Sequence, residues 1–464
     1  MKKLFVSVGL AAAGTAGLQI SSAYALDALD QNMWNVSASL RGFYDDNYDT
    51  LSNKRGSYGF EVSPTIGFSI PMQQTEFGMR YTYGLYYYED RENAGLNPID
   101  QSHQLDLWLD HAFTERWQAK LLDTLAIGQE PELLQGAGTP FRANGNNIAN
   151  VVTLSVNTDW TRLFSTQLTA SDKFYDFQNT AGYADLFPLN STFGPTPPIT
   201  VPPTPPPNFP TPGPAGIGTS NGAGLAGLLN RFENSVALDF QWHIAPETML
   251  FIGYQYEQVN YTGNEPIAYN PYYQTPNFGP AFYYSDDRNN YSHFGYIGAQ
   301  HQILENLSAT AKVGIQYTDY YNDSLSSTTI SPYAELSVIY TYLPGCYAQF
   351  GLSHQQNATD VAQVGTDGQV TQSQESTAIY LTLNHQITPK LLGTLILNWQ
   401  YSDFTSGAYT TDPDIDYSAG LNLKYTFSRH FSGEVGYNYD NLQSGIDGRA
   451  YNRNRVYLGV GAAY

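Results

Sequence analysis

The chain has 464 residues, a formal net charge of −21, 38 tyrosines and 41 glycines, and a mean hydropathy of −0.35. The acidic excess excludes nucleic acid as a partner, because a surface that binds nucleic acid is basic. The one cysteine, Cys346, excludes an internal disulfide framework.

The N-terminal segment has the layout of a secretory signal peptide. Lys2 and Lys3 precede an apolar run, and residues 23–25 read Ala-Tyr-Ala, which is a cleavage site of the A-x-A type. We therefore expect a signal peptide over residues 1–25 and a short periplasmic segment over residues 26–33. Beyond them, no stretch of the sequence is long and apolar enough to cross a membrane as a helix.

From residue 34 onward, hydrophobic residues alternate with polar ones, and this period of two is typical of β-strands. Trp34, Val36 and Leu40 share one side of the first such segment, and polar residues share the other side. Eighteen segments follow this pattern, near residues 34–44, 57–70, 75–88, 102–113, 117–128, 149–158, 163–176, 231–244, 248–261, 291–304, 307–319, 329–343, 347–356, 375–387, 390–402, 415–427, 431–440 and 453–464.

Short and long connections alternate between these segments. Short turns are expected at residues 71–74, 114–116, 245–247, 305–306, 344–346, 388–389 and 428–430. An even number of strands with short periplasmic turns and longer external loops is typical of outer-membrane barrels. We therefore predict an all-β fold, a single transmembrane antiparallel β-barrel of about 18 strands over residues 34–464, with both termini in the periplasm.

One connection is much longer than the others. Residues 178–230 hold two proline-rich runs followed by a Gly- and Ala-rich stretch. Proline lacks an amide donor and resists a sheet, so we expect a long external loop there. Residues 218–222 form a formal G-x-S-x-G motif, but a nucleophile elbow needs a strand-to-helix turn that this region lacks. We therefore predict no catalytic residue and no enzyme activity.

The charged residues distinguish the two faces of the predicted barrel. A lysine or arginine turned to lipid at the membrane midplane costs on the order of 2–4 kcal/mol, so charges should avoid one row of each strand. Eleven charged residues on the opposite row are predicted to line the pore: Arg41, Glu61, Arg80, Asp106, Lys120, Asp239, Glu257, Lys312, Glu335, Lys424 and Glu434. They either pair along the wall or set up a transverse field that orients solutes.

Two acidic residues do not fit this division. Asp123 and Asp172 fall on the apparent lipid row of the fifth and seventh segments. We therefore expect each of these strands either to contain a bulge, which shifts the alternation, or to end earlier than its hydrophobic pattern suggests.

The two ends of the barrel segment resemble known outer-membrane proteins. The last strand ends in Tyr464 and resembles the C-terminal strand of bacterial outer-membrane barrels, which implies that Tyr464 is part of a signal for the barrel-assembly machinery. Residues 34–464 as a whole look like the outer-membrane beta-barrel porin families of Gram-negative bacteria. Residues 44–47, Tyr-Asp-Asp-Asn, resemble the first hairpin of one such family. The resemblance implies an integral protein of the cell outer membrane.

The third external loop is a candidate constriction. General diffusion porins fold their third loop into the barrel, and this resemblance implies that the corresponding loop near residues 130–147 narrows the pore. Glu130, Glu132 and Arg142 would then face the constriction.

The function predicted from these features is a porin-like channel for passive diffusion of small hydrophilic solutes or ions, without cofactor or metal. The expected partners are outer-membrane lipid, lipopolysaccharide and the assembly machinery. An exopolysaccharide export conduit or another saccharide-handling barrel is the alternative, because Tyr269, Tyr273 and residues 282–284 could stack on sugar rings. A surface adhesin or structural barrel that displays the proline-rich loop is a further alternative. The solute, the ion preference and the choice between monomer and homo-oligomer stay open.

Overall fold

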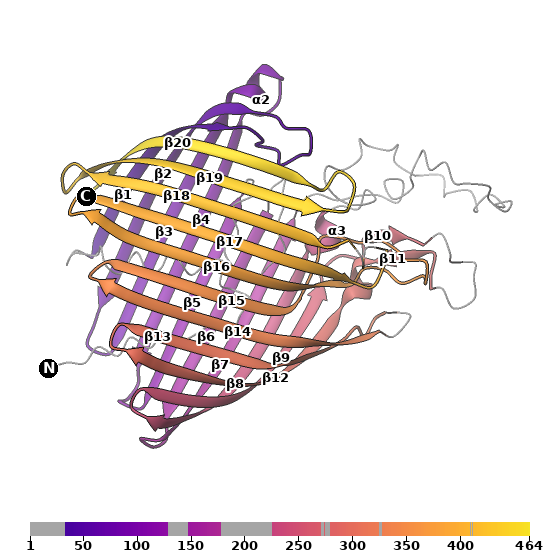
Figure 1. Ribbon diagram of the computed structural model, residues 1–464, viewed down its shortest axis with the longest axis horizontal. Helices are drawn as coiled ribbons and strands as arrows, with labels where there is room; N and C mark the ends of the chain where they lie inside the picture. Colours follow the sequence, from indigo (N-terminus) through magenta and orange to yellow (C-terminus); the bar gives the residue numbers. More distant parts are fainter. Residues whose placement is uncertain are drawn as a thin grey trace.

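The computed structural model describes residues 33–128, 147–177, 225–270, 273, 279–323, 327–408, 410 and 412–464. Eighteen strands form one antiparallel sheet (Figure 1). In chain order they are β1 (Trp34–Asp45), β2 (Ser57–Pro71), β3 (Thr75–Tyr88), β4 (Ile99–Ala112), β5 (Trp117–Gly128), β6 (Asn147–Asp159), β7 (Phe164–Phe177), β8 (Arg231–Ala245), β9 (Thr248–Tyr261), β12 (Asn290–Leu304), β13 (Leu307–Asp319), β14 (Thr328–Leu343), β15 (Cys346–Asn357), β16 (Ser373–Thr388), β17 (Leu391–Thr405), β18 (Asp414–Thr426), β19 (Phe431–Ser444) and β20 (Tyr451–Ala463).

The remaining described elements are short and lie in the connections. Strands β10 (Pro266–Tyr269) and β11 (Phe282–Tyr284) form a separate hairpin. Helices α2 (Glu89–Asn93), α3 (Leu225–Leu229) and η3 (Ser285–Arg288) each make one turn or slightly more. Within the described ranges, no helix has the length and apolar character needed to cross a membrane.

The sheet closes on itself because the first strand pairs with the last. Strand β1 lies between β2 and β20, and Arg41 stands opposite Glu61 on one side and Gly459 on the other. Every other strand pairs with its neighbours in chain order, including β9 with β12. The result is an up-and-down barrel without open edges. The predicted eighteen-stranded barrel is confirmed, and each predicted strand end lies within four residues of the observed one.

The two rims of the barrel differ in their connections. At one rim, here called the short-turn rim, the strands are joined by tight turns such as the one between β14 and β15. Strand β1 begins at this rim, and strand β20 ends there (Figure 1). At the other rim, the long-loop rim, the connections are long and include α3, β10 and β11.

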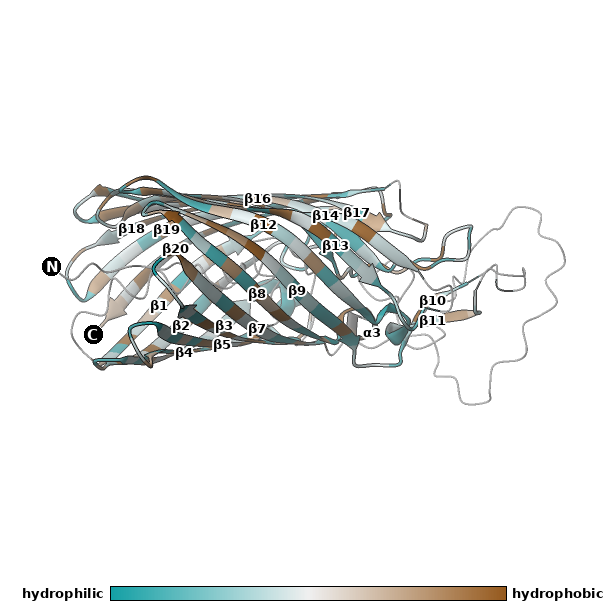
Figure 2. Ribbon diagram, turned by 90° about the horizontal axis from the view of Figure 1, so that it is seen from below, coloured by the Kyte–Doolittle hydropathy of each residue, from teal (hydrophilic) through white to brown (hydrophobic). Residues whose placement is uncertain are grey.

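The side chains of successive residues point to opposite faces of the wall, as in any β-strand. Large apolar residues on one row are strongly exposed, for example Ile330 at 73%, Leu458 at 69% and Val313 at 56%. Such exposure belongs to the outer face of a barrel, whereas the opposite row holds the buried polar residues Lys173, Gln255 and Glu335. Figure 2 shows this alternation of hydrophobic and hydrophilic residues along the strands. The outer surface is therefore an apolar belt, and the protein is an integral outer-membrane barrel.

The expectation of a bulge or an early strand end at Asp123 and Asp172 is wrong. Strand β5 continues to Gly128 and β7 to Phe177, and the pairings of β4 through β8 run without a register shift past both residues. Because the register is unbroken, both carboxylates lie on the outer row. The strands are regular, so Asp123 and Asp172 are acidic residues on a lipid-facing row and do not mark an irregular backbone.

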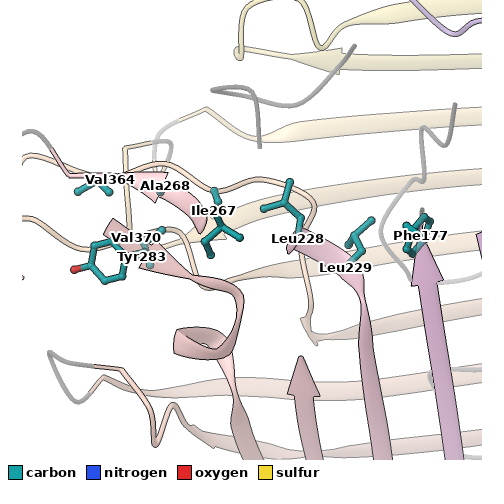
Figure 3. Close-up of a cluster of buried hydrophobic side chains, with 9 residues drawn as sticks. Phe177, Leu228, Leu229, Ile267, Ala268, Tyr283, Val364 and Val370 are labelled. Carbon is teal, nitrogen blue, oxygen red and sulfur yellow. The ribbon is translucent and has the colours of Figure 1, made fainter. Parts of the chain in front are cut away.

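The largest cluster of buried apolar side chains lies in the connections at the long-loop rim. Its members come from three loops and the end of β7: Phe177, Leu228, Leu229, Ile267, Ala268, Tyr283, Ala362, Val364 and Val370. Figure 3 shows the labelled members following one another from the tip of β7 through α3 to the β10–β11 hairpin. The described parts of these connections are thus packed against one another.

Candidate functional site

The inner wall carries a charged cluster centred on Arg41. Its Nε lies 2.7 Å from Oε1 of Glu434, and its Nη1 lies 3.1 Å from Oε1 of Glu61. Glu61 is on the adjacent strand β2, but Glu434 is on β19, with β20 in between. The residue of β20 at this point is Gly459, and a Cβ there would lie only 2.7 Å from Cγ of Arg41. The missing side chain therefore lets the arginine reach across one strand.

The cluster is extended by further polar groups of the wall. Asn422 donates from Nδ2 to Oε2 of Glu434 at 3.2 Å. Arg455 places Nη2 at 3.5 Å from Oε2 of Glu61. The predicted pore-lining residues Arg41, Glu61 and Glu434 are thus brought together at one place on the inner wall, where they pair along the wall.

Two more ion pairs join residues of the predicted set on adjacent strands. Arg80 on β3 lies 2.6 Å from Asp106 on β4. Lys312 on β13 lies 3.4 Å from Glu335 on β14. Because opposite charges stand directly across a strand pair, each basic group offsets the charge of its neighbour.

Aromatic residues surround the Lys312 pair. The ammonium of Lys312 lies 5.1 Å from the ring centre of Tyr296, and the hydroxyl of Tyr296 donates to Oδ1 of Asp239 at 2.7 Å. Tyr333 donates to Glu335. Together with Phe251 and Phe294, these two tyrosines form a buried cluster on the inner side of β9, β12 and β14. Aromatic rings therefore accompany the ion pairs on this side of the wall, and at the other cluster the ring centre of Tyr457 lies 5.2 Å from the guanidinium of Arg41.

The remaining predicted residues also lie on the inner row. Glu257 on β9 accepts a hydrogen bond from Gln255 at 3.4 Å. Lys120 is the fourth residue of β5, and Lys424 is two residues from the end of β18, so both are near the short-turn rim, where they are exposed. The charged residues close to that rim are therefore more hydrated than those farther along the wall.

Near the long-loop rim, the inner row carries further charged groups. Glu233 accepts from Lys173 at 3.1 Å and from Arg231 at 2.7 Å. Arg453 donates from Nε to Oδ2 of Asp45 at 2.8 Å. Their sequence signal was the same inward row, but they lie at the strand ends, where the sequence does not separate wall from loop.

The connection between β15 and β16, residues 358–372 and here called the mouth loop, lies against loops from several parts of the rim. Tyr283 of β11 donates to the carbonyl oxygen of Gly368 at 2.6 Å. Gln372 donates to Asp323, in the β13–β14 connection, at 2.9 Å. Asp323 is in the adjacent connection and Tyr283 is two connections away, so this loop reaches past its neighbour along the rim and lies over the mouth of the barrel.

Arg288, at the end of η3, fastens one side of the mouth loop. Its guanidinium is buried and donates to three backbone carbonyls, those of Gln372 at 3.1 Å, Thr359 at 2.6 Å and Leu228 at 3.3 Å. Three connections are therefore tied to a single side chain. Leu228 belongs to the β7–β8 connection, which is adjacent to that of Arg288, so Arg288 joins this connection to the mouth loop.

Arg449, between β19 and β20, fastens the other side. Its Nη1 and Nη2 donate to the two carboxylate oxygens of Asp360, both at 2.7 Å, and its Nε donates to Asp414 at 2.7 Å. Burial alone would lower the pKa of this guanidinium, but the two carboxylates outweigh it and raise the pKa. Arg449 and Asp360 are both almost fully buried, so this bidentate pair is shielded from water.

One acid in the connection that carries Arg288 has a raised pKa. Burial, together with the nearby charges of Asp286 and Asp323, raises the pKa of Asp287 to about 6. Its Oδ2 accepts the backbone N–H of Tyr284 at 2.8 Å, which closes the turn of η3. The turn that carries Arg288 therefore contains an acid that titrates near neutral pH.

The predicted constriction residues Glu130, Glu132 and Arg142 lie outside the described residues. Within the described ranges, the segment over the mouth is the mouth loop, which the sequence analysis did not single out. Its signal in the sequence is weak: Asp360 and the apolar Val361, Ala362, Val364 and Val370 stand among polar residues. Nothing local indicates that these side chains become buried.

One family model matches the C-terminal part of the chain. Residues 372–464, which cover β16 to β20, match the model of the family described as "Putative beta-barrel porin 2". Among curated proteins, none matches the sequence.

Several solved outer-membrane proteins align with most of this chain at low identity. OpdK from Pseudomonas aeruginosa is 9% identical with a TM-score of 0.42, over 93% of this chain and 99% of that one. OccAB4 from Acinetobacter baumannii is 9% identical with a TM-score of 0.41, and the alignment covers 93% of this chain and 99% of that one. The FrpB iron transporter from Neisseria meningitidis is 10% identical with a TM-score of 0.42, and the alignment covers 95% of this chain and 82% of that one. At such values the resemblance does not bear on what passes through the barrel.

Proposed function

We propose that the protein is an outer-membrane channel through which small hydrophilic solutes or ions diffuse passively. In this proposal the short-turn rim and both termini face the periplasm, and the long-loop rim faces the exterior. This is the usual orientation of barrels with short turns on one side and long loops on the other.

The observation that carries the proposal is the division of the wall into two faces. The outer row is apolar and exposed, whereas the inner row holds ion pairs such as those of Arg41 and Arg80. In a barrel of eighteen strands, the side chains of the wall alone do not fill the interior. A polar interior that is not filled is hydrated, so it offers a path to solutes that lipid excludes.

In this proposal the mouth loop determines the size of the entrance. It is anchored by Arg288 on one side and by Arg449 on the other, and its residues Thr359, Val361 and Ala362 are buried by their neighbours. Solutes would pass beside this loop before they reach the ion pairs of the inner wall.

The experiment is planar-bilayer recording with the purified full-length protein. Discrete and stable conductance steps are expected in a potassium chloride solution, and vesicles that contain the protein should swell in small sugars but not in large ones. Absence of both conductance and swelling would contradict a channel and favour an adhesive or structural barrel.

A saccharide-handling channel is the second candidate. Tyr269, Tyr273 and Phe282 form a half-buried ring cluster on the β10–β11 hairpin, with centroids of Tyr269 and Phe282 at 5.4 Å. Tyr283 belongs instead to the packed loop core. Uncharged oligosaccharides of graded length should then interrupt the ion current for longer as their length increases, whereas a general channel would show no such dependence.

The processing and assembly of the chain follow the same proposal. Residues 1–25 would be removed as a signal peptide, and Tyr464 would be read by the barrel-assembly machinery. Tyr464 is 90% exposed, and its backbone exchanges hydrogen bonds with Val36 at 2.8 and 3.1 Å. No catalytic role is assigned to any residue. Deletion of Tyr464 should lower the amount of folded barrel in the outer membrane without changing its conductance.

A further inference from the structure

The outer wall carries a group of polar side chains where an apolar belt is required. Asp123 on β5, Asn150 on β6, Asp172 on β7 and Asn234 on β8 all lie on the outer row. Asp172 stands directly opposite Asn234, and both Asp123 and Asp172 stand opposite Val152. We call these four residues the polar island.

Along β5 to β8, apolar residues separate the island from both rims. Toward the long-loop rim the outer row continues with Leu125, Ile127, Ile148, Phe174 and Phe232, and the rings of Phe174 and Phe232 lie 4.8 Å apart. Toward the short-turn rim it continues with Leu121, Leu154, Leu168, Val236 and Leu238. Along β5 to β8 the island is therefore enclosed within the belt, and on the side of β9 Asn234 stands opposite Gln258, which donates to Asn260 at 3.5 Å.

Other outward-facing carboxylates in the described strands are placed differently. Asp176, Asp319, Glu375 and Asp403 each lie within three residues of the long-loop end of their strand, where headgroups and water are near. In contrast, Asp123 is the seventh of the twelve residues of β5. Only near the rim can solvent satisfy a carboxylate, so the island needs another source of partners.

The island does not satisfy itself. Asn150 donates from Nδ2 to Oδ1 of Asp123 at 2.8 Å and to the carbonyl oxygen of Thr124 at 3.3 Å. Among the described residues, no hydrogen bond or ion pair is found for the side chains of Asp172 and Asn234, although the two stand opposite each other. Lipid chains offer neither donors nor acceptors to these groups.

We propose that the outer wall of β5 to β8 is a self-association surface, against which a second copy of this chain packs within the membrane. The island contains two carboxylates that accept hydrogen bonds and two amides that donate them, so it is complementary to itself. A twofold axis through the polar island brings the amide of Asn234 in each copy toward Asp172 of the other copy, as in any isologous contact. The surrounding exposed Leu154, Leu168 and Val236 supply apolar area for close packing.

The test measures the mass of the purified full-length protein in a mild detergent and in lipid nanodiscs. The wild-type protein should have the mass of a dimer or higher oligomer. The variant with Asp172→Leu and Asn234→Leu should be monomeric at the same concentration, and it should remain a folded barrel, because leucine suits a lipid-facing row. Retention of the heat-induced gel shift of a folded barrel, together with conductance, verifies the fold.

The matched control is the variant with Ala299→Leu and Ala311→Leu, two residues that stand opposite each other on the outer row of β12 and β13. It adds similar apolar bulk to a different part of the wall and should keep the oligomer. A monomeric wild-type protein in both media would overturn the proposal, with or without copurified lipopolysaccharide. An oligomer that survives in the first variant, or that dissociates in the control, would also overturn it.

Discussion

Arg41 and Arg449 each hold two carboxylates, but Arg41 lies on the lumen wall and Arg449 lies beneath the loops of the mouth. The Arg41 side chain is 30% exposed and that of Arg449 is 1% exposed. The pairing chemistry is the same, so the difference in hydration separates their roles. A partly hydrated pair tolerates the loss of a partner and affects the ions in the lumen. A dehydrated pair holds structure, because an unpaired charge there has no solvent.

The comparison also explains how distant parts of the chain become connected. Arg41 reaches Glu61 and Glu434 across regular strands whose register puts them side by side. Arg449 reaches Asp360 and Asp414 only because two connections fold toward the first residue of β18. The first cluster depends on closure of the barrel, and the second depends in addition on loop packing.

The largest effect is expected for Arg449→Met. This change leaves Asp360 and Asp414 buried without their partner, which costs about 3–5 kcal/mol. The packing of the mouth loop should be lost while the strands persist. Protease cleavage within residues 358–372 should accelerate, and single-channel conductance should rise, because the entrance widens.

A triple variant controls for this prediction. Asp360→Asn and Asp414→Asn, added to Arg449→Met, remove the unpaired charges and should restore part of the protease resistance. If Arg449→Met alone leaves both cleavage and conductance as in the wild-type protein, the two arginine clusters do not differ in the way described.

A smaller effect is expected for Arg41→Gln. Asn422 still donates to Glu434, and Arg455 stays close to Glu61. The loss of stability should be about 1–2 kcal/mol, between the values for exposed and buried pairs. The lumen gains net negative charge, so the reversal potential in a salt gradient should move toward cation selectivity.

The matched variant for this wall cluster is Glu434→Gln, which removes one negative charge from the same place. Its reversal potential should move in the opposite direction, toward anions. Equal shifts of the same sign in both variants would mean that the cluster does not face the conducting path.

A pH effect is expected at the turn that carries Arg288. The pKa of Asp287 is about 6 in the folded protein against an ordinary 3.8, so the neutral acid is the form that the fold favours. Its contribution to stability is complete below about pH 4 and is lost as the pH rises through 6. The mouth loop should thus resist proteases better at pH 5 than at pH 7.5, by less than about 1 kcal/mol because this group is partly hydrated.

Asp287→Asn should remove this pH dependence and raise resistance at neutral pH, since an amide oxygen can still accept the N–H of Tyr284. Asp447→Asn, an exposed aspartate on the β19–β20 connection, is the control and should keep the wild-type profile. A profile that is unchanged in Asp287→Asn would assign the titration to another group.

The smallest effect is expected for Lys120→Gln near the short-turn rim. Lys120 is exposed, so its loss should change the free energy of unfolding by no more than about 0.5 kcal/mol. A slight shift of the reversal potential toward cations is the expected readout. A loss of folding as large as that of Arg449→Met would contradict the link between exposure and role.

Much of the barrel could be predicted because its signal is local. A side-chain period of two appears in each strand of the barrel. The apolar row of each strand indicates the face that meets lipid. Arg41, Arg80 and Lys312 were assigned to the inner row on this basis, and that is where they lie. Asp123 and Asp172 were misjudged because we took a charge on the apolar row as a sign of irregular backbone, although the register is regular.

The alternation along each segment was enough to predict the strand count, the closed barrel and its two faces, since neighbouring residues of a strand must point to opposite sides. The packing of the mouth loop against the other loops could not be predicted from this alternation. Arg449 and Asp360 are 89 positions apart, and Arg288 meets Thr359 over 71 positions. Irregular backbone has no period, so which loops pack together is decided only when the closed sheet brings their ends to one rim.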